Sequence, residues 1–109
     1  LPEDQLNAVI SVNGSSPAYV YLLAKALIDG AEQQGIDRET ALCLVAGTLS
    51  GSAKMLLESG HSPDELIKMV SSPGGTTLEA LKVLYDRGFE NALIDAMQAC
   101  TRRAEELGR

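Results

Sequence analysis

The segment Ala18–Ala24 constrains the fold of this chain more than any other, because seven residues in a row carry no charge and are apolar in character. A helix that is apolar all round needs cover on every side. A chain of 109 residues builds one modest core, and a few short helices rarely enclose one of their number completely. We therefore expect a second chain to supply the missing cover, with tight packing inside one chain as the alternative.

A run of small residues further along favours the same conclusion. Gly47, Ser50, Gly51 and Ala53 fall within a predicted helix and form a low ridge on it. Each glycine lowers helix propensity by about 1 kcal/mol. That cost usually has a packing reason, here the close approach of another backbone. Packing within the chain is again the alternative to dimerisation.

The first half of the chain contains residues that typically start or end helices. We expect a short helix over roughly Glu3–Ser11, which stops at Asn13-Gly14. A second helix has Ser16 as its N-cap and Pro17 at its first position, and Gly35 is its stop. The third and longest begins at the N-cap Asp37 and runs to Ser59-Gly60.

The second half continues in the same way, so that we predict an all-α fold. The capping box Ser62–Glu65 opens a fourth helix, which must end before Pro73. Thr76 and Glu79 form a second predicted box at the start of a helix that stops at Gly88. A last helix covers Glu90–Leu107. No alternating apolar and polar run marks a strand, and no linker or repeat divides residues 1–109.

Composition excludes several classes of function. The chain carries 15 acidic against 9 basic residues, a net charge of −6, so we expect no nucleic-acid binding and no polybasic membrane patch. Lys25 and Asp29 interrupt the stretch Ala18–Ile28, which we take as the longest membrane-span candidate, so no span is expected. The chain begins with Leu1 and has no signal-peptide pattern, and we interpret it as a piece of a longer, cytoplasmic protein.

Few residues suggest metal or acid–base chemistry. Cys43 and Cys100 are far apart and fit no metal or redox spacing, so we expect buried free thiols. His61 is interpreted as a solvated turn residue. One histidine and two distant cysteines cannot supply a metal site, and none is expected. The acidic residues lie at helix ends or on polar faces, where they complement helix dipoles: Glu32, Asp37, Glu39, Glu58, Asp64 and Glu65.

The segment Ser71–Thr77 is the best candidate for a binding site. Two consecutive glycines lead directly into a helix start, whose unpaired N–H groups and partial positive charge attract an anion by roughly 0.3 to 1 kcal/mol. Thr77 adds a hydroxyl, and Pro73 restricts the loop. A small carboxylate would fit this cradle. The alternative is a plain connector between two helices, with Thr76 as a cap.

Three motifs in register make the whole chain resemble the C-terminal domain of pyrroline-5-carboxylate reductases. They are NGSSPAYV at Asn13–Val20, GSAKMLLE at Gly51–Glu58 and VSSPGGTT at Val70–Thr77, which is followed by Glu79-Ala80-Leu81. The tail Gly88–Leu107 also looks like the last helix of that family.

The resemblance implies a fold, a site and a reaction. The fold would be an interlocking helical dimerisation domain of five to six helices, like the C-terminal domain of 6-phosphogluconate dehydrogenase, and the protein a homodimer or a larger assembly of dimers. The carboxylate of pyrroline-5-carboxylate or proline would bind at the Pro73–Thr77 loop, with Thr77 forming a hydrogen bond near the ring nitrogen. The substrate-binding residues are Ser72, Pro73, Gly74, Gly75, Thr76 and Thr77, with Thr77 as the catalytic one.

In such enzymes a preceding Rossmann domain binds NADPH or NADH, whose hydride reduces the C=N bond to give L-proline. This chain has no Gly-x-Gly-x-x-Gly, so we expect the fragment alone to be inactive. It departs from the family pattern at Asn13 and Ser16, and at Ile67-Lys68, where the family usually has Lys-Asp. Two other hypotheses stay open: a free-standing helical dimerisation module, and a two-domain dehydrogenase for another small acid.

Overall fold

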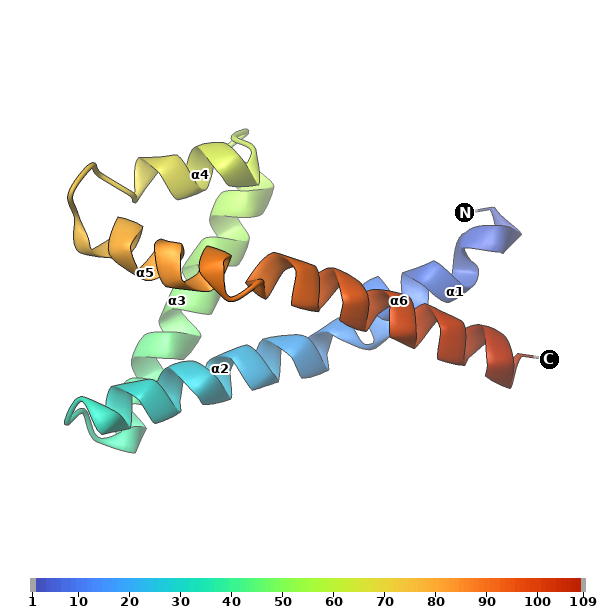
Figure 1. Ribbon diagram of the computed structural model, residues 1–109, viewed down its shortest axis with the longest axis horizontal. Coiled ribbons are helices and arrows are strands. Elements are labelled where there is room, and N and C mark those ends of the chain that lie inside the picture. Colours follow the sequence, from blue (N-terminus) through green and yellow to red (C-terminus); the bar gives the residue numbers. More distant parts are fainter. Residues whose placement is uncertain (1, 109) are drawn as a thin grey trace. The chain divides into compact units, whose positions relative to one another are not determined.

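The computed structural model describes residues 2–108, and this part of the chain is helical with no strand (Figure 1). The order begins with a 3-10 turn, η1 (Glu3–Gln5), a single α-helical turn, α1 (Leu6–Val9), and a π-helical turn, η2 (Ile10–Gly14). Five longer helices follow: α2 (Ser16–Gln33), α3 (Arg38–Glu58), α4 (Pro63–Met69), α5 (Thr76–Asp86) and α6 (Phe89–Leu107). The predicted all-α class is confirmed.

Two predicted boundaries are confirmed by the turn between α2 and α3. Gly35 has φ +93°, and two hydrogen bonds close the end of α2, from Gly35 N–H to the Glu32 carbonyl and from Ile36 N–H to the Ala31 carbonyl, both 3.0 Å. This pair of bonds is the Schellman pattern. Asp37 then has extended backbone angles, and its carboxylate accepts from the Thr40 N–H at 3.1 Å. The helix α3 therefore begins directly after Asp37, its predicted N-cap.

The capping box at the start of α4 is also confirmed. Ser62 Oγ accepts from the Glu65 N–H at 3.2 Å, while the Glu65 carboxylate accepts from the Ser62 N–H at 2.8 Å. The helix ends at Met69, before Pro73, as expected. The Ser62 N–H and the Ser62 hydroxyl, with a further contribution from His61, hold the pKa of the Glu65 carboxyl below its usual value.

Three boundary predictions need correction. The predicted first helix is broken into η1, α1 and η2, although the helical segment ends at Gly14 as expected. The helix α2 begins at Ser16 itself, so Ser16 is not the N-cap and Pro17 is the second residue. Among the described hydrogen bonds, none joins Thr76 to Glu79, so the second capping box is not formed. In the last two cases the helix begins without the side-chain hydrogen bond that the sequence pattern predicted.

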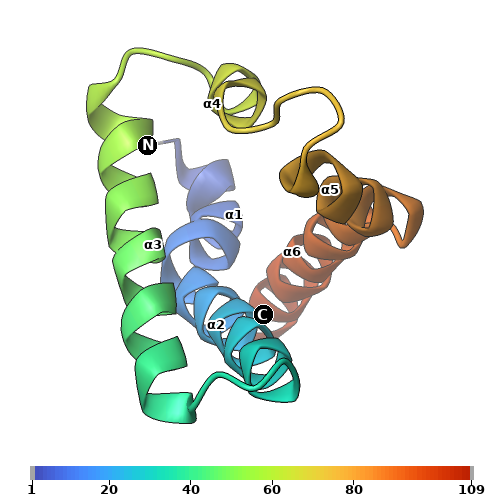
Figure 2. The same cartoon turned by 90° about the vertical axis from the view of Figure 1, so that its left-hand side faces the viewer.

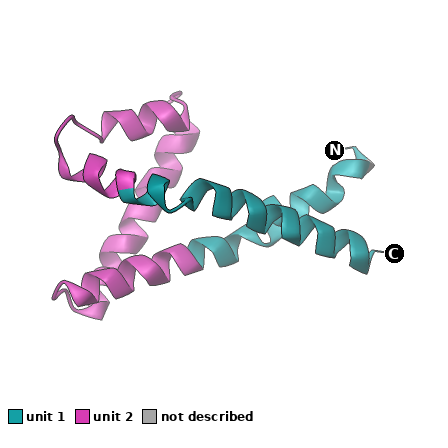
Figure 3. Cartoon of the chain, viewed as in Figure 1, with its two compact units in different colours: residues 1–21, 83–109 teal, residues 22–82 magenta. Residues whose placement is uncertain are grey.

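The chain divides into two units, coloured separately in Figure 3. The first consists of residues 1–21 and 83–109, of which 2–21 and 83–108 are described. In it, α1 and η2 pack against α6. Ser11, in η2, is buried and donates its hydroxyl to the Ala8 carbonyl at 2.7 Å. At the end of η2 a hydrogen bond of 3.2 Å joins Ser15 Oγ to Cys100 Sγ on α6.

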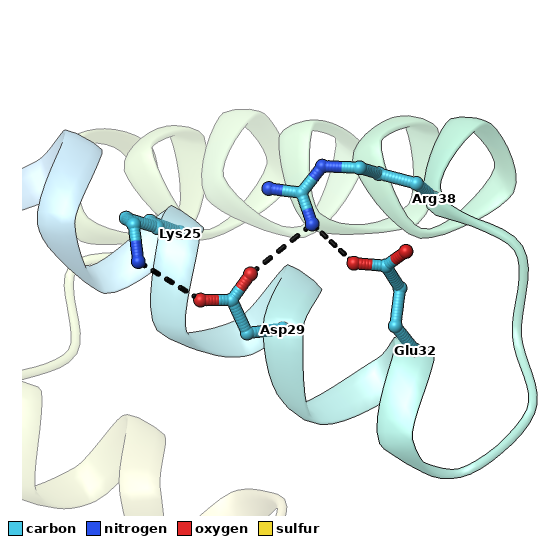
Figure 4. A network of polar contacts seen from close by, with 4 residues as sticks. All are labelled: Lys25, Asp29, Glu32 and Arg38. Atoms are coloured by element: carbon cyan, nitrogen blue, oxygen red, sulfur yellow. Dashed lines mark hydrogen bonds and ion pairs between the residues drawn. The ribbon is translucent and has the colours of Figure 1, made fainter.

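The second unit comprises residues 22–82. Figure 2 shows α3 turning away from α2 after the connecting turn, and α4 lying beyond the far end of α3. Ion pairs brace the turn: Arg38 binds both Asp29, at 3.1 Å, and Glu32, and Asp29 also binds Lys25 at 3.0 Å (Figure 4). The bonds from Lys25 and Arg38 lower the pKa of Asp29, and the bonds to Asp29 and Glu32 raise the pKa of Arg38.

Very few apolar side chains are buried in the described chain. Ile28 and Ala41 are the buried hydrophobic residues, whereas Tyr21 and Leu22 are 71% and 67% exposed. The apolar segment at the start of α2 is therefore left largely exposed, which favours cover by a second chain.

Two expectations about apolar segments need correction: the two thiols are not buried, and the longest candidate for a membrane span is α3 rather than Ala18–Ile28. Cys43 is exposed, because the face of α3 that carries it is uncovered in this chain, and Cys100 is only partly buried. Both are free thiols, as expected. The helix α3, 21 residues with a mean hydropathy of 1.4 over 18 residues, is long and apolar enough to cross a membrane by length and composition. A helix covered by another protein chain has the same composition.

Candidate functional site

The loop between α4 and α5 contains a tight four-residue turn. Gly75 donates its N–H to the Ser72 carbonyl at 3.0 Å, Pro73 is the second residue of the turn, and Gly74, the third, has φ +74°. Proline in the second place and a glycine of positive φ in the third are typical of a type II turn. The two middle residues therefore have the backbone preferences that this turn requires.

Gly75 is crowded by the residue that accepts its hydrogen bond. A Cβ atom at position 75 would lie 2.8 Å from Ser72 Oγ and 3.1 Å from the Ser72 carbonyl oxygen. Both distances are below ordinary van der Waals contact, and the second involves backbone. The turn thus keeps its close form because residue 75 has no side chain.

The turn delivers the chain directly into α5, which begins at Thr76. Within the described part of the chain, no hydrogen bond uses the amide N–H groups of Thr76, Thr77 or Leu78. These groups, with the positive end of the helix dipole, make an exposed site that attracts an anion. Thr77 is exposed in the same turn of helix. The predicted site residues Ser72–Thr77 therefore come together in one short segment.

The start of the loop is fixed to α4. Ser71 donates its hydroxyl to the Ile67 carbonyl at 2.6 Å and its N–H to the Lys68 carbonyl at 3.2 Å. Two of the positions at which the sequence departs from the expected family pattern, Ile67 and Lys68, thus hold the loop through their carbonyl groups. A backbone carbonyl does not depend on the side chain, so these substitutions leave the anchoring intact.

The single histidine of the chain lies in a different turn from this loop. His61 is exposed in the turn before α4, with Nδ1 3.7 Å from the Glu65 carboxylate, as the sequence predicted. Within residues 2–108, no group of three or more histidine, cysteine, aspartate or glutamate side chains is arranged to hold a metal ion. The arrangement can bind an anion and donate hydrogen bonds, which is substrate positioning.

The sequence analysis did not predict two polar features of the structure. The Arg38, Asp29, Glu32 and Lys25 network joins two helices through a turn, and only the i, i+4 spacing of Lys25 and Asp29 signalled part of it. In the other unit, the Tyr19 hydroxyl is closed off from solvent and forms no hydrogen bond among the described atoms. Burial, together with the neighbouring Cys100, raises the pKa of Tyr19.

Known proteins resemble this chain over nearly its whole length. The family model described as pyrroline-5-carboxylate reductase dimerisation matches residues 3–107. A pyrroline-5-carboxylate reductase of Escherichia coli is 44% identical over 109 residues, which are all of this chain and 40% of that protein. One from Methanosarcina acetivorans is 41% identical, again over all of this chain and 40% of the relative.

Solved structures agree with these matches. A pyrroline carboxylate reductase of Plasmodium falciparum, crystallised with NADP bound, has a TM-score of 0.97 at 30% identity and covers all of this chain with 42% of its own. A pyrroline-5-carboxylate reductase of Coxiella burnetii has a TM-score of 0.95 at 42% identity, over 98% of this chain and 40% of its own. The chain spans about two fifths of the length of the relatives it matches.

The fold, with its uncovered apolar helices, and the family match place this chain in the class of all-helical dimerisation domains. More specifically, it belongs to the pyrroline-5-carboxylate reductase dimerisation family.

Proposed function

We propose that this chain is the C-terminal dimerisation and substrate-binding domain of a pyrroline-5-carboxylate reductase. That enzyme reduces 1-pyrroline-5-carboxylate to L-proline with NADPH or NADH, in proline biosynthesis. The family match over residues 3–107 supports the proposal, as do relatives of that name that match as their own final two fifths. Activity, substrate and assembly of the whole protein all form part of this proposal.

One observation carries the assignment of the site: the turn Ser72–Gly75 leads straight into the free amides at the start of α5. A substrate carboxylate would accept hydrogen bonds from these amides, helped by the helix dipole. We assign its binding to Ser72, Pro73, Gly74, Gly75, Thr76 and Thr77. The Thr77 hydroxyl would then lie beside the ring nitrogen of the bound imine and orient it.

When bound, the nicotinamide supplies the hydride that reduces the C=N bond. The residues of this chain do not fit a dinucleotide by themselves, because the described part has no strand that leads into a glycine-rich helix start. We therefore assign the cofactor mainly to an N-terminal Rossmann domain of the full protein. The work of this domain is to hold the imine in place, which contributes to catalysis through orientation.

We also propose a homodimer, or an assembly built from such dimers, in the cytoplasm. The exposed apolar side chains of α2 and α3, including Tyr21, Leu22 and Leu44, support a second chain as their cover. The net charge of −6 supports a protein without nucleic-acid partners. Burial of α3 in the dimer then explains why this helix is long and apolar enough to cross a membrane.

The test is an assay of the full-length protein with pyrroline-5-carboxylate and either NADPH or NADH, beside small hydroxy acids with the oxidised cofactors. We expect turnover of the imine at least a hundredfold above any hydroxy acid. Preference for a hydroxy acid would instead identify another dehydrogenase with the same helical domain. Absence of turnover, in a protein that forms dimers, would favour a dimerisation module without catalysis.

A further inference from the structure

A groove lies between α3 and α4, within the second unit. Six residues of α3 line it, together with residues at the start, middle and end of the α4 region: Gly47, Thr48, Gly51, Ser52, Met55, Leu56, Pro63, Leu66, Ile67, Met69 and Val70. It is open and has a volume of about 510 Å³. None of its lining residues is charged, so an occupant must itself be uncharged and apolar.

Two glycines form part of the groove wall. Apart from the surrounding backbone of α3 itself, a Cβ atom at Gly47 or at Gly51 would have no described atom within 4 Å. Neither glycine is required by a positive φ, since both lie inside α3. The backbone conformation at these two positions therefore does not require glycine. The missing side chains leave room for large side chains from an approaching helix.

One uncharged, fully apolar stretch of this chain is the beginning of α2. Tyr21 and Leu22, 71% and 67% exposed, are the large side chains that such a groove needs. The helices α4, α5 and α6 all carry charges along their length. The middle of α3 is uncharged too, but it already forms one wall of the groove through Gly47, Gly51 and Ser52.

We propose that the α2 segment Val20–Leu23 of a second copy of this chain occupies the groove between α3 and α4. In a two-fold symmetric pair the contact occurs twice, because each copy offers both a groove and an α2 segment. The inference rests on the proposed homodimer and goes beyond it by naming the segment and its receiving groove. It explains the exposed tyrosine and leucine on α2 and the glycines on α3 by a single contact.

The test is a disulfide between two copies of the full-length protein, with Cys43 and Cys100 replaced by serine and alanine. One copy carries Leu22→Cys and the other Met55→Cys, and the two are co-expressed with different tags. A disulfide needs Cα atoms about 4.4 to 6.8 Å apart. We expect a covalent pair carrying both tags after mild oxidation.

The matched control replaces Met55→Cys by Leu57→Cys. Leu57 is 85% exposed on the same helix but does not line the groove. Crosslinking at least tenfold more efficient with Met55→Cys supports the inference. Equal crosslinking of both pairs, in a protein that sediments as a dimer, overturns the inference and leaves the proposed dimer intact. A monomer at every concentration overturns both.

A second measurement avoids engineered cysteines. Gly51→Leu fills the groove wall while improving helix propensity, so a loss of dimer cannot come from an unstable α3. We expect the dimer dissociation constant to rise at least tenfold, measured by sedimentation equilibrium. Gly30→Ala, on α2 with no atom within 4 Å of the added Cβ, should leave it unchanged. An unaltered constant for Gly51→Leu would contradict the inference.

Discussion

Ser72 and Gly75 are held so close that a Cβ on residue 75 would lie 2.8 Å from Ser72 Oγ and 3.1 Å from the Ser72 carbonyl oxygen. The hydroxyl of Ser72 can rotate away, but the carbonyl belongs to the turn itself and accepts the Gly75 N–H. Any side chain at position 75 therefore opens the turn. The start of α5 would move with it.

Gly75→Val should weaken substrate binding more than folding. Opening the turn displaces the amides that we assign to the substrate carboxylate, and a hydrogen bond to a charged group is worth about 1.5 to 3 kcal/mol, or roughly ten- to a hundredfold in affinity. We expect the KM for pyrroline-5-carboxylate to rise by that factor in the full-length enzyme. Gly30→Ala is the matched control and should leave KM unchanged, since its added Cβ has no neighbour within 4 Å. Normal KM in Gly75→Val would remove this turn from the site.

Thr77→Ala should lower kcat/KM while the dimer stays intact. The lost hydroxyl contributes one hydrogen bond, about 0.5 to 1.5 kcal/mol, so the expected fall is roughly three- to tenfold. Thr77→Ser keeps the hydroxyl and should restore most of the activity. Steady-state kinetics on pyrroline-5-carboxylate, with sedimentation to check the dimer, measure both effects. Unchanged kinetics in Thr77→Ala would exclude its hydroxyl from the reaction.

Ser62→Ala should destabilise the start of α4 by about 1 kcal/mol, because it removes the acceptor for the Glu65 N–H. Thermal unfolding of the full-length protein measures the change. Ser62→Asp retains an acceptor oxygen at the cap and should unfold near the parent temperature. If the alanine and aspartate variants unfold at the same temperature, the capping box does not contribute to stability.

Stability should fall in acid as the helix-terminal carboxylates become protonated. Bonds from Lys25 and Arg38 depress the pKa of Asp29, and bonds from Thr40 depress that of Asp37. A carboxyl whose pKa is lower when folded stabilises the fold above its unfolded pKa, about 3.9, and loses that contribution as the pH falls through the folded value. Denaturant unfolding at pH 6, 4 and 3 should show the decline.

The free energy of unfolding of the variant Asp29→Asn should decline less steeply than that of the parent between pH 6 and pH 3. Its unfolding at pH 6 should also depend less on salt, because the Arg38 and Lys25 contacts to Asp29 are exposed and screened. Identical acid profiles for parent and variant would mean that the ion pairs at this turn make no net contribution.

Local signals in the sequence predicted the helix ends well where a side chain or a glycine fixes the backbone. Asp37, the Ser62–Glu65 box and Gly35 all form the bonds or angles expected of them. The expected box at Thr76 is not formed, although α5 starts there, because the turn at Ser72–Gly75 already directs the chain into the helix. The π-helical turn Ile10–Gly14 left no sequence signal, since its extra residue is accommodated by packing against α6.

The sequence by itself determined the helices, the close turn before α5 and the family, because caps, glycines and short motifs act over a few residues. Only the tertiary structure decided that the apolar side chains of α2 and α3 stay uncovered within one chain, that Arg38 bridges two carboxylates, and that α3 and α4 enclose a groove without charge. Burial and ion pairing depend on segments that meet in space. The order of residues along the chain does not fix which of those surfaces another chain must cover.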